Sequence, residues 1–155
     1  MLQAQSISAI IGELRRHNPS IPFLIETNGT VPNRIDPVHH RSIVFSVSPK
    51  LSNSGEAPHV AQAAADFVVR AAYDGIATYV KFVSDGSDSS FEEINKFRNG
   101  LQNRGVIPDV YVMPEQRFAG GSCPEVERIA DFCIRHAYHY CARVHNTVYG
   151  NRRGT

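Results

Sequence analysis

Short apolar segments recur along this chain at nearly regular intervals. We expect strands at 21–25, 42–47, 76–83, 109–113 and 139–145. The last three intervals between strand starts are each roughly 30 residues, the length of one strand–helix–strand unit. Segments that are apolar on both sides are typical of parallel strands covered by helices. The spacing therefore predicts an α/β fold of about five mostly parallel strands with right-handed crossovers.

Apolar residues at helical spacing precede the first strand and follow the second, third and fourth, whereas the interval between the first and second strands is expected to be a loop. The segment 3–17 should be an amphipathic helix, and three further helices should follow the second, third and fourth strands. Two of the later helices carry capping-box patterns at their starts, namely Ser89 with Glu92 or Ser90 with Glu93, and Ser122 with Glu125.

Composition and charge narrow the classes of function. The chain has 155 residues, 42% of them hydrophobic, which suits a single domain over 1–155. A formal net charge of +1 argues against a strongly basic nucleic-acid-binding domain. No apolar run is long enough to cross a membrane. The first 20 residues carry charged side chains and no small-residue cleavage site, which argues against a signal peptide.

The cysteines and histidines leave several interpretations open. Three cysteines in the spacing C-x9-C-x7-C argue against a disulfide framework and do not match short metal-binding spacings. We interpret them as small buried residues or free thiols in a reducing, cytoplasmic setting. His39 and His40 are interpreted as solvated loop residues. His136 and His139 could bind zinc with a nearby cysteine, although a helix and a strand do not readily converge on one ion.

Polar side chains follow every predicted strand. Because ligands of parallel α/β sheets gather at the carboxyl ends of the strands, these residues form a candidate rim for a small polar ligand of mixed charge. The rim contains Glu26 to Thr30, Ser48 to Lys50, Ser84 and Asp85, Met113 to Gln116, and His145 to Thr147. Each part also has a structural explanation. Glu26 and Asn28 could form a turn with Gly29 at positive φ, Ser48 to Lys50 could be a plain strand exit, and His145 could be a core histidine.

Four segments together resemble a known family. ETNGT at 26–30, SPKLSNSGE at 48–56, YVMPE at 111–115 and ARVHNTVYGNRRGT at 142–155 are similar, in order and spacing, to the later part of the 7-carboxy-7-deazaguanine synthases. These are radical S-adenosylmethionine enzymes. The resemblance implies a partial (β/α) barrel, usually in a homodimer. It also implies ring contraction of 6-carboxy-5,6,7,8-tetrahydropterin to 7-carboxy-7-deazaguanine in queuosine and 7-deazapurine biosynthesis. The implied cofactors are S-adenosylmethionine, a [4Fe-4S] cluster and Mg²⁺.

The resemblance also implies roles for individual residues. The S-adenosylmethionine contacts would be Asn28, Ser48, Pro49 and Lys50, together with the segment Met113, Pro114, Glu115 and Gln116. This last segment is often written Gln-Pro-x-x in the family, and here Met113 replaces the glutamine. The substrate contacts would be Glu26, His145 and the carboxylate of Thr155.

Two motifs of the family do not occur in this sequence. These are the CxxxCxxC loop that holds the cluster and the Gly-Gly-Glu-Pro segment that binds the amino group of S-adenosylmethionine. Residues Met1 to Gln3 resemble the family's residues directly after Gly-Gly-Glu-Pro. We therefore expect this chain to be the carboxyl-terminal part or one subunit of such an enzyme, inactive without an N-terminal cluster-bearing chain or segment.

The missing motifs have a consequence for solubility and leave two other interpretations open. The segment 21–25 would then be an unpaired apolar edge strand, and the chain alone would be poorly soluble. A non-catalytic S-adenosylmethionine- or pterin-binding module and a degenerate fragment are the alternatives.

Overall fold

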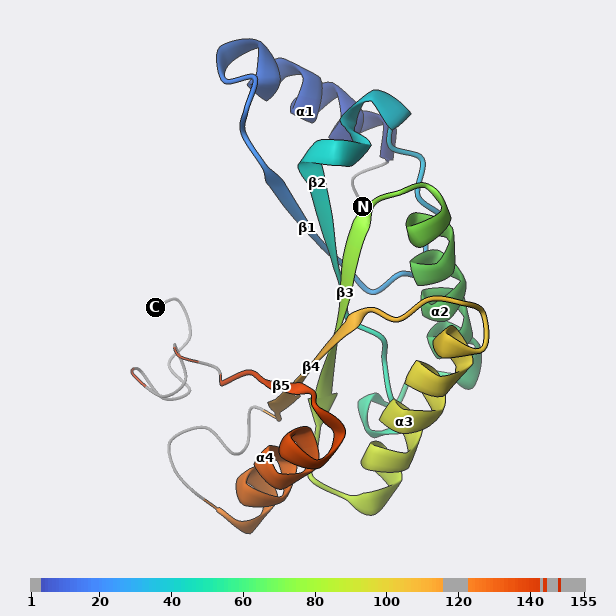
Figure 1. The fold of residues 1–155 in the computed structure, drawn as a ribbon, viewed down its shortest axis with the longest axis vertical. Helices are drawn as coiled ribbons and strands as arrows, with labels where there is room; N and C mark the ends of the chain where they lie inside the picture. The colour runs from blue at the N-terminus through green and yellow to red at the C-terminus, as the bar shows by residue number, and fades with distance from the viewer. Residues whose placement is uncertain (1–3, 116–122, 143, 145–147, 149–155) are drawn as a thin grey trace.

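The computed structural model describes residues 4–115, 123–142, 144 and 148. Its helices and strands alternate along the chain (Figure 1). They are α1 (Ala4–His17), β1 (Phe23–Thr27), β2 (Ile43–Val47), α2 (Pro58–Tyr73), β3 (Ala77–Ser84), α3 (Asp88–Gln102), β4 (Asp109–Pro114), α4 (Pro124–His136) and β5 (His139–Tyr140). Two short 3₁₀ helices, η1 (Pro37–Ser42) and η2 (Ser52–Ser54), lie in the loops before and after β2. None of the described helices is long and apolar enough to span a membrane.

The strands form one sheet in the order β1-β2-β3-β4-β5, and every neighbouring pair is parallel. This arrangement confirms the predicted α/β class with a parallel sheet. The predicted last strand over 139–145 is too long, because among its described residues only His139 and Tyr140 belong to the strand that pairs with β4. The final ladder bond is donated by the Cys141 N–H to Val112 O. Since all strands run the same way, their carboxyl ends lie along one edge of the sheet.

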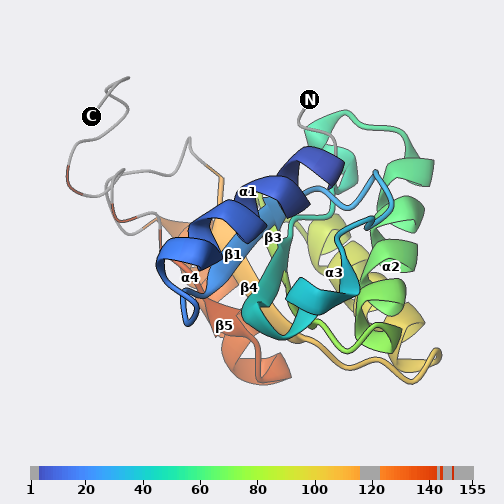
Figure 2. The ribbon, with the colours of Figure 1, turned by 90° about the horizontal axis from the view of Figure 1, so that it is seen from above.

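One face of the sheet packs against helices, and we call it the near face. Phe45 of β2 meets Phe67 of α2 edge-on, with ring centroids 4.9 Å apart. Phe82 of β3 meets a ring of α3 in the same manner. α4 continues this layer through a stacked ring pair with α3, and Figure 2 shows α2 and α3 together on one side of the sheet. Each buried Val or Phe side chain of this face stabilises the fold by about 1.5–3 kcal/mol.

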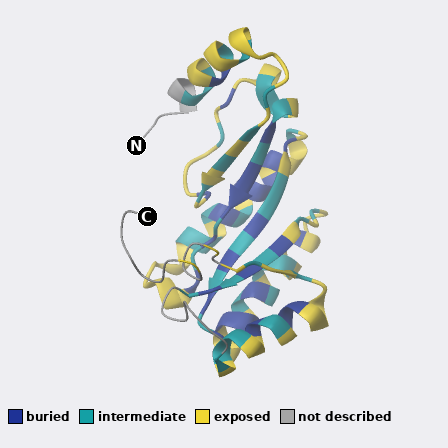
Figure 3. Ribbon diagram, turned by 90° about the vertical axis from the view of Figure 1, so that its left-hand side faces the viewer, coloured by how far each residue is buried: buried dark blue, intermediate teal, exposed yellow. Residues whose placement is uncertain are grey.

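The opposite face, which we call the far face, carries the alternate residues of the strands. Along β3, half-buried residues alternate with buried ones, as seen from this side in Figure 3. Neighbours across the strands in this layer are Glu26, Ser46 and Tyr79. The next layer toward the carboxyl ends contains Lys81 of β3 and Tyr111 of β4. The far face is therefore much more polar than the near face.

β1 lies at one edge of the sheet and pairs with β2. This position confirms the expectation of an apolar edge strand. Leu24 in this strand is 59% exposed. α1 lies near the amino ends of β1 and β2, where Ile11 is buried and Arg15 donates a hydrogen bond to Ser42 Oγ.

The capping box predicted for the start of α3 is wrong in position. The N-cap of α3 is Ser87, whose side chain accepts a hydrogen bond from the Ser90 N–H. The Asp85 carboxylate accepts hydrogen bonds from the N–H and the hydroxyl of Ser87. The hydroxyl oxygen of Ser87 is thereby oriented to accept the Ser90 N–H. α4 begins at Pro124 with Cys123 at the N-cap position and no side-chain capping bond, and Ser122 lies outside the described residues.

Candidate functional site

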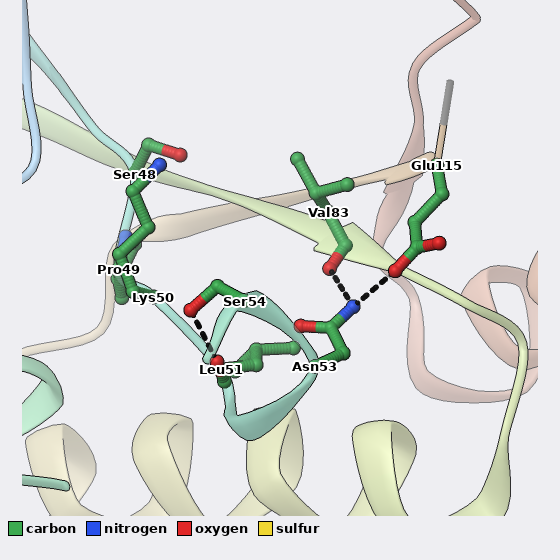
Figure 4. Close-up of a pocket in the computed structure, with 8 residues that line it drawn as sticks. All are labelled: Ser48, Pro49, Lys50, Leu51, Asn53, Ser54, Val83 and Glu115. Atoms are coloured by element: carbon green, nitrogen blue, oxygen red, sulfur yellow. Dashed lines mark hydrogen bonds between the residues drawn. The ribbon is translucent and has the colours of Figure 1, made fainter. Parts of the chain in front are cut away.

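A cavity of about 180 Å³ opens at the carboxyl ends of β2, β3 and β4. Figure 4 shows the residues that line it: Ser48, Pro49, Lys50, Leu51, Asn53, Ser54, Val83 and Glu115. Ligand pockets generally enclose about 300–1,000 Å³. The cavity is therefore large enough for one end of a nucleotide-sized ligand, and the rest of such a ligand would extend beyond it.

The chain enters this cavity directly from β2. The Ser48 N–H donates to Thr27 O at 2.8 Å and so continues the ladder between β1 and β2 by one bond. Pro49 has no N–H to continue the ladder, so the chain leaves the sheet at this point. Leu51 is 4% exposed and anchors the following turn, η2, to the core. The turn ends at Gly55, whose φ of +74° suits glycine.

Asn53 connects the turn η2 to the end of β3 and to the residue that follows β4. Its Nδ2 donates to Val83 O at 3.3 Å and to Glu115 Oε1 at 2.8 Å. Figure 4 shows the amide between the ends of β3 and β4. The Glu115 N–H in turn donates to Ser84 O, which extends the β3–β4 ladder and fixes the backbone that carries the carboxylate.

Glu93 of α3 fixes the turn η2 through hydrogen bonds to Ser52. Its Oε2 accepts the Ser52 N–H at 2.8 Å, and its Oε1 accepts the Ser52 hydroxyl. A carboxylate that accepts both a backbone and a side-chain donor forms charge-assisted bonds, which are stronger than neutral ones. The position of η2, and with it the cavity wall, therefore depends on α3 as well as on the sheet.

The cavity combines charges of both signs with neutral polar groups. Lys50 and Glu115 are both half-buried. Hydroxyl groups come from Ser48 and Ser54, and Ser54 Oγ already donates to Leu51 O at 2.6 Å. An ammonium and a carboxylate in one small cavity suit a zwitterionic or mixed-charge ligand, because each ligand charge then finds an opposite partner.

The structure brings some of the predicted site residues together and separates others. Ser48, Pro49, Lys50 and Glu115 line the one cavity. Met113 lies on the far face, since it pairs in register with Val83. Pro114 is buried and is the register partner of Ser84. Ser84 bonds to Ser90 of α3, so this position belongs to the near face.

Asn28 forms the turn after β1. Its Oδ1 accepts the Thr30 N–H at 3.2 Å and the Thr30 hydroxyl at 2.8 Å. Gly29 follows with φ of +73°. Asn28 and Gly29 therefore form the turn that was the structural explanation for their occurrence after the strand.

Glu26 lies on the far face, where its Oε1 is 2.8 Å from Lys81 Nζ. Its side chain is 67% exposed. Three predicted contacts, Gln116, His145 and Thr155, lie outside the described residues.

Sequence reasoning missed several residues of this region. Asn53, Ser54, Leu51 and Val83 line the cavity, and Lys81 contacts Glu26. Asn53 lies in the segment SPKLSNSGE at 48–56, where the resemblance assigned roles to Ser48, Pro49 and Lys50 alone. A signal for Lys81 was present, because a charged residue in the apolar run YVKFV needs a partner.

The cysteines and histidines show no metal site within the described part of the chain. No three His, Cys, Asp or Glu residues there are placed to hold an ion. The three cysteines, Cys123, Cys133 and Cys141, are free thiols, and burial raises the pKa of Cys133 to about 11. His139 stacks on Tyr111 at 4.5 Å.

His39 and His40 are not solvated as the sequence suggested. Both are half-buried. The ring nitrogens of His40 lie 3.2 Å from Asp74 O and 3.1 Å from Ile35 O, which ties η1 to the turn after α2. The loop returns from the carboxyl end of β1 to the amino end of β2, and η1, its last part, packs directly before β2.

Asp85 completes the polar rim at the end of β3. Burial by itself raises the pKa of this carboxyl, but hydrogen bonds from the Ser87 side chain and N–H outweigh burial, so the pKa lies below its ordinary value. Asp85 is therefore an acceptor that organises the start of α3.

No protein-family model, curated protein or solved structure matches this chain. Its sequence motifs and the geometry of the cavity are therefore the basis on which a function can be proposed.

Proposed function

We propose that this chain is the carboxyl-terminal part, or a subunit, of a 7-carboxy-7-deazaguanine synthase with a partial (β/α) barrel of the radical S-adenosylmethionine type. The observation that carries the proposal is the cavity at the carboxyl ends of the parallel strands. It combines the Ser48-Pro49-Lys50 segment with Glu115, two segments that the resemblance assigns to S-adenosylmethionine. These segments are separated by more than 60 residues in the sequence, so a shared cavity supports a shared ligand.

The chemistry of the cavity suits one end of S-adenosylmethionine. In this proposal the Lys50 ammonium and the hydroxyl of Ser48 bind the ribose hydroxyls or the carboxylate of the methionine end. Glu115 accepts from ligand hydroxyl or ammonium groups while Asn53 holds it in place. The protein's task is to orient the reagent, since the cofactor carries the difficult chemistry.

The residues of this chain do not fit the [4Fe-4S] cluster. Such clusters need cysteine thiolates converging on one site, and neither the C-x9-C-x7-C spacing nor the described structure provides this. We propose that a separate N-terminal chain or segment supplies the cluster. The described residues also contain no group of carboxylates and imidazoles placed to hold Mg²⁺, so no role of this chain is derived for that ion.

Glu26, the proposed substrate contact that the structure describes, lies on the far face. Glu26 presents a largely exposed carboxylate, which can accept N–H groups from the ring of 6-carboxy-5,6,7,8-tetrahydropterin. His145 and the Thr155 carboxylate are the further substrate contacts that we propose. The cavity and Glu26 flank the same part of the sheet, since Val83 in the cavity wall and Lys81 beside Glu26 belong to one face of β3.

Calorimetric titration of the chain with S-adenosylmethionine tests the proposal. Replacing Lys50 by methionine should weaken binding about 10- to 150-fold, because a hydrogen bond to a charged group contributes about 1.5–3 kcal/mol. Lys50→Arg should retain most of the affinity. Lys96→Met is the matched control, because Lys96 is an exposed lysine of α3 that does not line the cavity. Absence of binding by the unmodified chain, or equal binding by the Lys50→Met variant, refutes the proposed cavity ligand.

Anaerobic co-expression with a cluster-bearing N-terminal segment of this enzyme family tests the reaction itself. We expect cluster absorbance and turnover of the carboxypterin only when both pieces are present. The alternative function is a non-catalytic S-adenosylmethionine- or pterin-binding module, and the missing cysteine set of this chain favours it. Ligand binding without turnover in the presence of the cluster-bearing segment would decide for the module.

A further inference from the structure

Lys81 is a charged residue in the middle of an apolar strand. Its neighbours in β3, Val80 and Phe82, are fully buried on the near face. Its own side chain reaches across β2, and its Nζ lies 2.8 Å from Oε1 of Glu26 in β1. The Lys81 side chain is 21% exposed, whereas that of Glu26 is 67% exposed. The carboxylate is thus open to solvent while the ammonium beneath it is largely covered.

This ion pair does little for the stability of the fold. A pair with an exposed member gains little Coulomb energy in water, and a long lysine side chain loses rotamer freedom when it is held. A β-branched apolar residue would suit this strand position better. The lysine instead holds one oxygen of Glu26 in place on the far face, while the Glu26 side chain remains largely exposed.

Ser46 provides an independent observation at the same place. It lies between Glu26 and Tyr79 in the register of the sheet, and it points to the far face because Phe45 beside it packs against α2. Ser46 is fully buried, and its Oγ has no hydrogen-bond partner in the described part of the chain. Buried hydroxyls are nearly always satisfied, so an orphan of this kind indicates a missing partner.

A row of rings borders these three residues on the other side. Tyr79 and Tyr111 have ring centroids 5.0 Å apart, and Tyr111 stacks on His139 at 4.5 Å. Tyr111 is the register partner of Lys81. Polar groups of both hydrogen-bonding types beside aromatic rings suit a flat heterocycle rather than a flexible chain.

We propose that Lys81 is a positioning residue for Glu26, and that Glu26, Lys81 and Ser46 form a subsite for the edge of a flat heteroaromatic ring with adjacent N–H donors and a carbonyl. The carboxylate, held in place by the lysine, accepts the N–H groups, and the Ser46 hydroxyl donates to the carbonyl. This inference rests on the proposed function and adds Lys81 and Ser46 to its substrate site.

A fluorescence titration with 6-carboxypterin, a stable aromatic form of the proposed substrate, tests the subsite. Lys81→Met should weaken binding at least fivefold, and Lys81→Arg should restore it to within twofold. The double variant Glu26→Gln with Lys81→Met should bind no more weakly than Glu26→Gln alone, because the lysine acts through the carboxylate. Melting temperature is measured in parallel, and Lys96→Met serves as the charge-matched control.

Ser46→Ala gives a second test that does not depend on the lysine variants. Deleting an unsatisfied buried hydroxyl should leave the melting temperature unchanged or higher, while the affinity for 6-carboxypterin falls at least threefold. Wild-type affinity in both Lys81→Met and Ser46→Ala overturns the subsite. So does a loss of melting temperature in Lys81→Met that arginine does not rescue. A chain that binds S-adenosylmethionine but no pterin overturns this inference alone, whereas a chain that binds neither overturns the proposed function as well.

Discussion

Replacing Gly29 by alanine tests how the turn after β1 is built. Gly29 has φ of +73°, and a Cβ at this position would lie 2.9 Å from Ala64 Cα and 3.1 Å from Val47 Cγ1. The left-handed conformation costs a non-glycine residue about 1–2 kcal/mol. Crowding against the backbone of α2 adds about 1–3 kcal/mol, because the helix cannot yield as a flexible side chain does. We therefore expect Gly29→Ala to lower the free energy of unfolding by about 2–5 kcal/mol.

The chain contains a matched control for this substitution. Gly55 has nearly the same φ, +74°, but a Cβ there would meet nothing within 4 Å. Gly55→Ala should therefore cost only the conformational term of about 1–2 kcal/mol. Urea unfolding followed by circular dichroism at 222 nm measures both variants. For a domain of this size, 1 kcal/mol corresponds to about 2–4 °C in melting temperature. If Gly29→Ala is no less stable than Gly55→Ala, the contact with α2 is not what requires glycine.

Four further substitutions or treatments probe other parts of the structure. Glu93→Gln should weaken S-adenosylmethionine binding by about fivefold, because the clamp on Ser52 loses its charge; an unchanged dissociation constant would contradict the clamp. The folded pKa of Asp85 lies below its ordinary value of 3.8, so Asp85 stabilises the fold above that pH, and the contribution is lost as pH falls through the folded pKa. The stability difference between wild type and Asp85→Asn should accordingly be present at pH 6 and disappear in strong acid, and a constant difference would refute it. Native Cys133, with a pKa of about 11, should react with Ellman's reagent at pH 8 far more slowly than the other two cysteines, and equal rates would show that it is accessible. Leu24→Lys should reduce light scattering by the isolated chain, because a lysine on an exposed edge strand opposes intermolecular pairing, and unchanged scattering would place the aggregation site elsewhere.

The regular spacing of apolar segments was sufficient to predict the parallel sheet. Strand existence follows from local patterns, and four of the five strands lie within two residues of the predicted ranges. The fifth strand is short because the alternation of HYCARVH satisfies a strand pattern without specifying a partner. Among the described residues of this segment, only His139 and Tyr140 have register partners in β4, and no local pattern indicates where the neighbouring strand ends.

The candidate site was predictable only where its residues follow a strand directly. Ser48 to Lys50 and Glu115 meet in one cavity because parallel strands end along one edge. Asn53 could not be assigned, since its partner Glu115 lies 62 residues away in the sequence. Lys81 was missed for the same reason, because its partner is 55 residues earlier and two strands away.

The order of the strands in the sheet has a consequence for how the molecule assembles during synthesis. Each strand neighbours the one made just before it, so the sheet can grow by one addition at a time with short loop closures. The amide of Asn53, by contrast, waits for a residue at the end of β4. The cavity is therefore completed only after most of the sheet exists, and a ribosome-bound intermediate that stops at β3 would have the scaffold without the wall that Glu115 provides.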